Sequence, residues 1–297
     1  MNVLVGFTGF VGSNLFETCE YDMVFNSKNI SDAYNLNPDI LVYAGVRGTK
    51  FLANMYPETD RKNIDDAIYN IKKINPRKLV LISTVDVYDD LNEKDETYTS
   101  DEAKLCIYGR HRLYLEEWVK NNILDYSIIR IPALYGKNLK KNFLYDLNHP
   151  VPTYLKKEIF DEAVKEEPLI KDCYQLTNDG IFKLINKNAN IDLDDYFSKS
   201  KYNSIHFTDS RSQYQFFNLK YLGKYIDYAI SENIRILNIV TEPVTASELY
   251  SLFIGKEFKN EITSNPIKYN LTSKYFNRYV FNKQEVLHDL LNYLHGN

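Results

Sequence analysis

The first fifteen residues contain the feature that most constrains how this chain can fold. An apolar run, Val3-Leu4-Val5, leads directly into glycines at positions 6, 9 and 12, and a helix-like pattern follows from Ser13. This order predicts a strand, a tight turn and the start of a helix. The chain has only eleven glycines, so chance is a poor explanation for three of them in the first twelve residues.

A glycine turn between a strand and a helix is typical of a dinucleotide site. With no side chains at Gly6, Gly9 and Gly12, and with Phe10 and Val11 between the last two, the backbone can approach a pyrophosphate. The phosphate charge then meets the free N–H groups of the helix start. The alternative is a turn that only packs the strand against the helix. The strand-turn-helix context favours a dinucleotide site.

Composition sets the outer bounds. At 297 residues, with 44% hydrophobic and 14% aromatic content, the chain can bury a full core in one large domain or two closely associated ones. The same values exclude a disordered or fibrous protein. A formal charge of −4 gives no overall attraction for nucleic acid or for an anionic membrane.

Neither a membrane segment nor a signal peptide is predicted. No apolar run is long enough to span a bilayer, and Met1 is followed directly by the first predicted strand. We therefore expect a cytoplasmic protein with no membrane partner. The three cysteines, Cys19, Cys106 and Cys173, are scattered, which favours reduced thiols over disulfides or a metal site.

The second predicted strand, residues 22–26, bears on the choice of cofactor. A dinucleotide fold that prefers NAD usually carries an acid near this point, which binds the ribose 2′-hydroxyl. Here the position is Asn26, and it is followed by Ser27 and Lys28, which could accept a 2′-phosphate. The sequence thus slightly favours NADP over NAD. A solvated loop lysine is the alternative interpretation of Lys28.

Two buried strands follow. Residues 40–45 form a continuous apolar run ending in Ala44-Gly45, which leaves room for a cofactor to lie close. After an amphipathic helix over residues 58–74, a strand over residues 78–84 ends in Ser83-Thr84. Ligands of a parallel sheet bind beyond the carboxyl ends of its strands, so Thr84 is well placed to contact a substrate. A threonine that only caps the strand is the alternative.

Tyr108 and Arg112 are four residues apart at the start of another predicted helix. They would share one helical face, which places a phenol beside a cation. A tyrosine of ordinary pKa, about 10, is a poor base at neutral pH, and an adjacent cation favours the phenolate. The alternative is a pair of ordinary surface residues.

These motifs together resemble the extended short-chain dehydrogenase/reductase family of nucleotide-sugar epimerases, dehydratases and keto-reductases. The matching segments are G-x-x-G-x-x-G at 6–12, Ser83-Thr84-x-x-Val87-Tyr88 and Tyr108-x-x-x-Arg112. The resemblance implies an α/β fold, a Rossmann-type doubly wound parallel sheet with a smaller, mostly helical substrate-binding lobe. It also implies that Tyr108 is the acid/base and Thr84 a catalytic hydroxyl, and that Ser83 and the helix residue Asn63 contact the cofactor.

Arg112 is the main departure from the family pattern. The family carries a lysine here, which lowers the pKa of the tyrosine and bonds the nicotinamide ribose. Arginine keeps the charge, but its planar fork is bulkier and aims differently. Two interpretations stay open: an enzyme with a repositioned cation, and a non-catalytic dinucleotide-binding sensor or scaffold.

Later segments of the chain carry most of the residues that are expected to contact the substrate. A strand over residues 126–130 ends in Arg130, and the resemblance implies that Arg130 contacts the sugar and Pro132 the cofactor. The basic cluster 137–142, which includes Asn142, suits a pyrophosphate-linked sugar or is a solvated loop. Arg211 is expected either to contact a substrate phosphate or to form a structural salt bridge.

The remaining pattern divides the chain. From His149 to about Tyr202 it shows charged, helical-looking stretches without clear strands, among them 154–164 and 180–186. A helix over 216–230 and a strand over 234–240 precede Thr245 and Glu248 at capping-box spacing. We therefore expect an NAD(P)-binding domain of residues 1–136 plus about 205–241, and a substrate-binding lobe of about 137–204 and 242–297.

The strand motif narrows the reaction. The family's dehydratases carry Asp and Glu directly after the catalytic threonine, whereas this chain has Val85 and Asp86. We therefore expect an NAD(P)-dependent 4-epimerase or 4-keto reductase of a nucleotide-linked sugar in carbohydrate biosynthesis, with Asp86 contacting the substrate. The resemblance also implies a homodimer, formed through the helices at 58–74 and 108–121.

Overall fold

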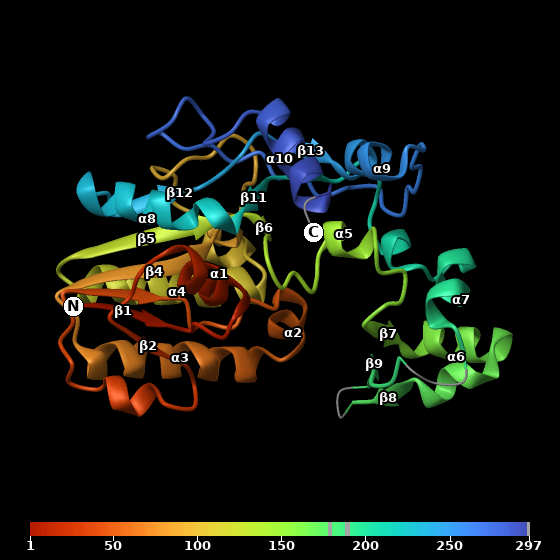
Figure 1. Cartoon of the computed structure of the whole chain (residues 1–297), viewed down its shortest axis with the longest axis horizontal. Helices are drawn as coiled ribbons and strands as arrows, with labels where there is room; N and C mark the ends of the chain where they lie inside the picture. The colour runs from red at the N-terminus through yellow and green to blue at the C-terminus, as the bar shows by residue number, and fades with distance from the viewer. Residues whose placement is uncertain (178–179, 188–190, 296–297) are drawn as a thin grey trace. The chain divides into compact units, whose positions relative to one another are not determined.

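The computed structural model describes residues 1–177, 180–187 and 191–295, which Figure 1 traces from the N-terminus to the C-terminus. The chain forms two compact units. Unit 1 comprises Met1–Leu139, Tyr214–Val244 and Lys268–Asn297, and unit 2 comprises Lys140–Gln213 and Thr245–Ile267.

A six-stranded sheet forms the middle of unit 1, and all of its strands run parallel in the order β12-β5-β4-β3-β1-β2. Its strands are β1 (Asn2–Val5), β2 (Met23–Phe25), β3 (Ile40–Tyr43), β4 (Lys78–Thr84), β5 (Tyr126–Ile131) and β12 (Ile236–Asn238). The chain passes from β1 to β2 on one side and then returns to β3 on the other side of β1. Ligands of doubly wound sheets bind beyond the carboxyl ends of the strands at such a switch point. The predicted fold class is confirmed.

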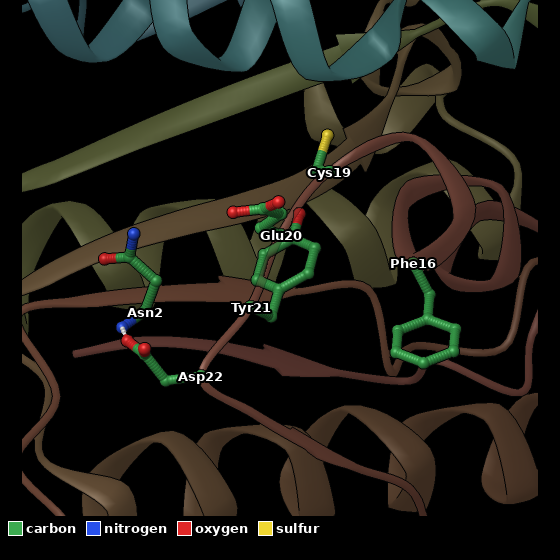
Figure 2. Close-up of a pocket in the computed structure, with 6 residues that line it drawn as sticks. All are labelled: Asn2, Phe16, Cys19, Glu20, Tyr21 and Asp22. Atoms are coloured by element: carbon green, nitrogen blue, oxygen red, sulfur yellow. Dashed lines mark hydrogen bonds between the residues drawn. The ribbon is translucent and has the colours of Figure 1, made fainter.

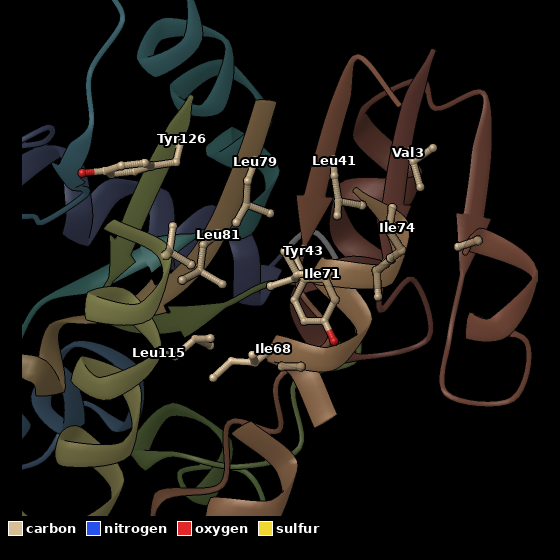
Figure 3. Close-up of a cluster of buried hydrophobic side chains, with 14 of the residues drawn as sticks. Val3, Leu41, Tyr43, Ile68, Ile71, Ile74, Leu79, Leu81, Leu115 and Tyr126 are labelled. Atoms are coloured by element: carbon tan, nitrogen blue, oxygen red, sulfur yellow. The ribbon is translucent and has the colours of Figure 1, made fainter. Parts of the chain in front are cut away.

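The two faces of the sheet bury alternate residues of each strand. Val3 and Val5 pack with helices α3 (Pro57–Ile74) and α4 (Ile107–Asn122), in the cluster that Figure 3 shows. Leu4 packs instead with α1 (Phe10–Thr18) and α8 (Leu222–Ser231) on the opposite face. Because side chains alternate along a strand, one short apolar run supplies both cores.

Helix α3 follows from its sequence. Its buried isoleucines and alanine recur at helical spacing along the face that meets the sheet. Pro57 occupies the first turn, which also contains Glu58 and Asp60, while Lys72 and Lys73 lie in the last turn. This distribution of charge matches the helix dipole.

Smaller elements complete unit 1. Strand β6 (Ala133–Tyr135) pairs in parallel with β11 (Phe216–Asn218), and α2 (Lys50–Met55) precedes α3. The others are η1 (Ile30–Ala33), η2 (Val85–Val87), η3 (Glu102–Lys104), η6 (Leu219–Tyr221) and α10 (Lys283–His295).

The expectation of a single helix over residues 216–230 was wrong at its beginning. Phe216 and Phe217 belong to β11, and the Asn218 side chain accepts the Lys220 N–H and so starts the turn η6, after which α8 begins at Leu222. An apolar run of a few residues does not by itself distinguish a strand from a buried helix.

Unit 2 also differs from its expected pattern. It contains helices, but it also holds an antiparallel sheet in the order β7-β9-β8 within the segment expected to lack strands. Residues 154–164 divide into β7 (Tyr154–Lys156) and the start of α6 (Lys157–Glu166), and the stretch 180–186 contains β9 (Ile181–Leu184). The remaining elements are α5 (Phe143–Asp146), η4 (Pro168–Asp172), β8 (Tyr174–Leu176), α7 (Leu193–Lys199), η5 (Ser204–Phe207) and α9 (Ala246–Ile254). Strands of three or four residues are too short to show a clear alternation.

The division of the chain into units falls within two short strands, β10 (Gln213–Tyr214) and β13 (Val244–Thr245). The capping box of α9 is confirmed, because Thr245 and Glu248 bond each other's backbone N–H groups. The C-terminal segment differs from the expected domain division, since Lys268–Asn297 is part of unit 1. The reason is tertiary: Leu271 is buried with Val85, Val87 and Tyr88 of unit 1.

Candidate functional site

The glycine turn lies between β1 and α1. Gly6 has a φ of +96°, which side chains rarely adopt, and its N–H donates to the Phe25 carbonyl at the end of β2. A Cβ at Gly12 would lie 2.1 Å from the Gly6 carbonyl oxygen, and one at Gly9 would lie 3.3 Å from it. The backbone therefore makes a turn that larger residues would force open.

The start of α1 can receive an anion. Its N-cap is Gly9, which has no side chain that could accept a hydrogen bond from the first N–H groups of the helix. The first turn also contains no acidic residue. Phe10 and Val11 are partly buried in this turn. The Asn14 side chain donates to the carbonyls of Phe10 and Lys137, which fixes the helix start against the loop after β6. Free N–H groups at a fixed helix start suit a pyrophosphate, so the residues present fit a dinucleotide.

The neighbouring strand ends add polar groups. At the end of β2, the Asn26 side chain accepts the Lys28 N–H, and Ser27 and Lys28 are exposed. At the end of β3, the Ala44 carbonyl group lies so close to the turn that a Cβ at Gly6 would be 2.6 Å from it, and Gly45 is exposed. The structure thus brings these predicted residues to the same sheet edge as the glycine turn.

Tyr108 lies in the first turn of α4 and is 8% exposed. Its N–H donates to the Asn54 side chain of α2, and the Thr84 side chain at the end of β4 is near its hydroxyl. Burial raises the pKa of Tyr108, while Arg112, Thr84 and Lys50 lower it and Asp86 raises it further. Tyr108 and Thr84, which the family resemblance names as catalytic residues, therefore lie near each other in unit 1.

Arg112 is buried and engaged with other parts of unit 1. It forms a bidentate ion pair with Asp60 of α3, at 2.7 and 3.0 Å, and donates to the Arg47 carbonyl at 2.5 Å. Its guanidinium carbon lies 4.3 Å from the centre of the Tyr108 ring. His111 also bonds Asp60. Arg112 thus places a positive charge over the face of the ring and ties three segments together.

Asp86 binds a second cation, Lys50, close to Thr84. One of its oxygens accepts from Lys50 Nζ at 2.7 Å and from the Tyr269 hydroxyl at 2.6 Å, and the other lies 3.5 Å from Thr84 Oγ1. Sequence reasoning missed Lys50, Asp60 and Tyr269. The position of Lys50 shortly after a strand end was a weak signal, but Tyr269 lies 183 residues from Asp86 and gave none.

Ser83 and Arg130 were expected to contact ligands, but both are buried and bonded to Glu116 of α4. Arg130 donates to both Glu116 oxygens, and Ser83 donates to one of them at 2.6 Å. Arg130 also donates to the Tyr88 hydroxyl. These contacts favour a structural role for both residues, because a buried cation needs a charged partner.

The other predicted residues are spread over both units. In unit 1, Asn63 is half-buried on α3 and Pro132 is half-buried between β5 and β6. In unit 2, Asn142 caps α5 by accepting the Tyr145 N–H, and Arg211 pairs with Asp209 and Glu261. Arg211 therefore forms the structural salt bridge that was the alternative to a contact with a substrate phosphate.

A pocket at the other end of β1 is lined by Asn2 and by residues at the end of α1 and the segment that follows it, which Figure 2 shows. Asn2 starts β1, whereas the glycine turn follows its last residue. This pocket is therefore separate from the glycine turn. Across residues 1–177, 180–187 and 191–295, no cluster of three or more His, Cys, Asp or Glu side chains could hold a metal ion. Nor does any helix in those ranges have the length and apolar character needed to cross a membrane.

Comparison with known proteins gives a likeness of fold. No model of a known protein family matches the chain, and no curated protein matches it. A solved dTDP-4-dehydrorhamnose reductase from Bacillus anthracis, in complex with NADP, matches with a TM-score of 0.66 and 16% identity, over 100% of this chain and 98% of that chain.

Two epimerases match over the same extent. A UDP-galactose 4-epimerase has a TM-score of 0.60 at 12% identity, over 100% of this chain and 99% of that chain. A UDP-N-acetylglucosamine 4-epimerase from Bacillus cereus has a TM-score of 0.56 at 17% identity, over 100% of both chains. This chain therefore shares the Rossmann-type fold of nucleotide-sugar reductases and epimerases, in agreement with its resemblance to the extended short-chain dehydrogenase/reductase family.

Proposed function

We propose that this protein is an NAD(P)-dependent 4-keto reductase or 4-epimerase of a nucleotide-linked sugar. The observation that carries the proposal is the buried Tyr108, which has Thr84 near its hydroxyl at a strand end in the same unit as the glycine turn. A shared fold with a reductase solved with NADP and with sugar-nucleotide epimerases supports it.

The glycine turn and the start of α1 would hold the pyrophosphate of the dinucleotide. Lys28 is exposed after β2, where it could bind a 2′-phosphate, so NADP is the favoured cofactor. When bound, the nicotinamide would supply or accept a hydride. The protein's part in the reaction is to place the substrate oxygen and to move its proton.

Tyr108 and Thr84 would perform the proton transfer. Both hydroxyls would bond the same sugar oxygen, where negative charge develops as the carbonyl is reduced. Because burial raises its pKa, Tyr108 is protonated at neutral pH and is ready to donate. This favours reduction of a keto sugar, in which Tyr108 acts as the acid, as the first proton step.

The test is a fluorescence titration with NAD, NADP and their reduced forms, followed by turnover with a panel of UDP-, GDP-, CDP- and dTDP-sugars. Tyr108→Phe should lower kcat by about 100-fold or more and leave dinucleotide affinity unchanged. The matched control is Tyr114→Phe, also on α4 but 37% exposed, which should keep full turnover. Normal turnover of Tyr108→Phe would contradict the assignment.

The second candidate is a non-catalytic dinucleotide sensor or scaffold. It is favoured by the engagement of Arg112 with Asp60 and the Arg47 carbonyl, since the charge at the family's lysine position also serves as a structural tie. A sensor would bind a dinucleotide but show no turnover with any sugar of the panel. In an enzyme, Arg112→Lys should change the rate strongly, because lysine cannot reproduce the bidentate pair.

A further inference from the structure

A tyrosine that gives its proton to a substrate must recover one before the next turnover. Arg112 can place charge beside Tyr108, but a guanidinium does not lose its proton in proteins, so it cannot relay one. The residue that occupies the family's lysine position is therefore unable to return the proton to Tyr108.

A different residue has the required chemistry and a connected path. Lys50 Nζ lies 2.7 Å from one oxygen of Asp86, and the other oxygen of that carboxylate lies 3.5 Å from Thr84 Oγ1. The Thr84 side chain is in turn near the Tyr108 hydroxyl, whose pKa it lowers. The Lys50 side chain is 39% exposed, so the path from the buried phenol ends at a group in contact with water.

The backbone around Lys50 is fixed against Tyr108. A Cβ at Gly48 would lie 3.9 Å from the Tyr108 hydroxyl oxygen, and Asn54 of the same segment accepts the Tyr108 N–H at 2.9 Å. Arg112 holds the Arg47 carbonyl. The position of Lys50 therefore depends on contacts with the same helix that carries Tyr108.

Resting on the proposed function, we propose that Lys50 is the proton donor that recharges Tyr108, acting through Asp86 and Thr84. After Tyr108 gives its proton to the substrate oxygen, Thr84 gives its own proton to the phenolate. Asp86 takes a proton from the Lys50 ammonium on one oxygen, and a turn of the carboxyl group carries it to Thr84. Water then reprotonates the Lys50 amine. One proton passes from solvent to Tyr108, and only O–H and N–H bonds form or break.

The charges around the path agree with this role. Burial acts to lower the pKa of Lys50, but the Asp86 charge and hydrogen bond raise it, with Cys106 and Tyr108 adding to the rise, so the net pKa is raised. Lys50 is therefore charged and able to donate at neutral pH. Tyr269, whose pKa is raised well above the ordinary value by burial and by Asp86, keeps its proton and donates to the same carboxylate.

The test measures how fast the Tyr108 hydroxyl exchanges its proton with solvent. In the full chain labelled with ¹³Cζ-tyrosine, an equal mixture of H₂O and D₂O splits the Cζ signal of any tyrosine whose hydroxyl exchanges slowly. Tyr108→Phe identifies the signal. Exchange should be fast in the wild type and slower by about tenfold or more in Lys50→Arg, which keeps the charge beside Asp86 but cannot relay.

The control is Lys62→Arg on the exposed surface of α3, which should leave exchange unchanged. Lys50→Met should slow exchange as much as Lys50→Arg, whereas a purely electrostatic role would be retained by Lys50→Arg and lost in Lys50→Met. Unchanged exchange in Lys50→Arg, or slow exchange in the wild type, would overturn the proposal.

Because this measurement uses no substrate, its outcome is independent of turnover. If no nucleotide sugar is turned over, the proposed function fails, and the exchange rates still report whether Lys50 reaches Tyr108. If turnover is found, kcat of Lys50→Arg should fall along with the exchange rate, and methylamine should restore part of the kcat of Lys50→Met. A loss of kcat without slower exchange would point to a structural role only.

Discussion

The two units differ in how closely backbone and charges are packed. In unit 1, a Cβ at Gly109 would lie 2.0 Å from the Asp86 carbonyl oxygen, whereas in unit 2 nothing among the described residues lies within 4 Å of such an atom at Gly255. Arg130 and Glu116 of unit 1 have side chains that are 5% and 0% exposed. Lys157 and Asp161, an ion pair of unit 2, are 65% and 45% exposed.

The difference teaches where this protein needs fixed geometry. The buried ion pairs of unit 1 hold α4, which carries Tyr108, against α3 and the sheet. Such pairs specify an arrangement more than they stabilise it, because the free energy lost in removing the charges from water offsets most of their mutual attraction. In unit 2 the surface pairs are screened by water and fix little. Four tests of this contrast follow, from the largest expected effect to the smallest.

Glu116→Gln should have the largest effect, because it leaves the buried Arg130 guanidinium without a negative charge. We expect a loss of about 3–5 kcal/mol of unfolding free energy, measured by denaturant unfolding. Replacing both partners, in Glu116→Leu with Arg130→Met, should recover most of this loss. A loss below about 1 kcal/mol for Glu116→Gln would show that the pair behaves like a surface pair.

Gly12→Ala tests the packing of the backbone. The new Cβ meets the Gly6 carbonyl oxygen, so we expect a loss of about 1–3 kcal/mol and at least tenfold weaker dinucleotide binding by fluorescence titration. Gly255→Ala is the matched change in unit 2. Its φ of +72° costs about 1 kcal/mol without a steric clash, and dinucleotide binding should not change. Equal binding by the two variants would remove the distinction between the units.

Asp146 provides a pH test within unit 2. Burial raises its pKa to about 7, above the value of about 3.9 in an unfolded chain. The neutral acid is thus favoured by folding, so its contribution is complete below about pH 4 and is lost as the pH rises through about 7. Amide hydrogen exchange in α5, the helix that carries Asp146, should report on the order of 1 kcal/mol less protection at about pH 8 than at about pH 5. Asp146→Asn should abolish this dependence, and its persistence in that variant would refute the assignment.

Lys157→Ala should have the smallest effect. It removes an exposed pair spaced four residues apart in α6, which is worth about 0.3–0.5 kcal/mol. Denaturant unfolding in low and high salt checks the value, and salt should reduce it further. A loss above about 1 kcal/mol would mean that surface charges matter as much in unit 2 as buried ones do in unit 1.

Local sequence determined the parts of the fold that depend on neighbouring residues. The glycines at 6, 9 and 12 set a turn because backbone sterics act over a few residues, and the apolar runs of the parallel strands follow from burial on both faces. Thr84 and Tyr108 could each be singled out from the sequence because separate family motifs mark the two positions. The capping box of Thr245 and Glu248 is equally local.

Only the tertiary structure decided which partners the charged side chains have. The spacing of Tyr108 and Arg112 predicted a shared helix face. It did not show that the Arg112 guanidinium donates its hydrogen bonds to Asp60 and to the Arg47 carbonyl. Lys50 and Tyr269 meet at Asp86 from segments far apart in the chain. The direction of a long side chain depends on partners brought by other elements, whereas a turn or a strand depends on adjacent residues. The sequence therefore determined the sheet and its glycine turn, and the tertiary structure determined which cations surround Tyr108.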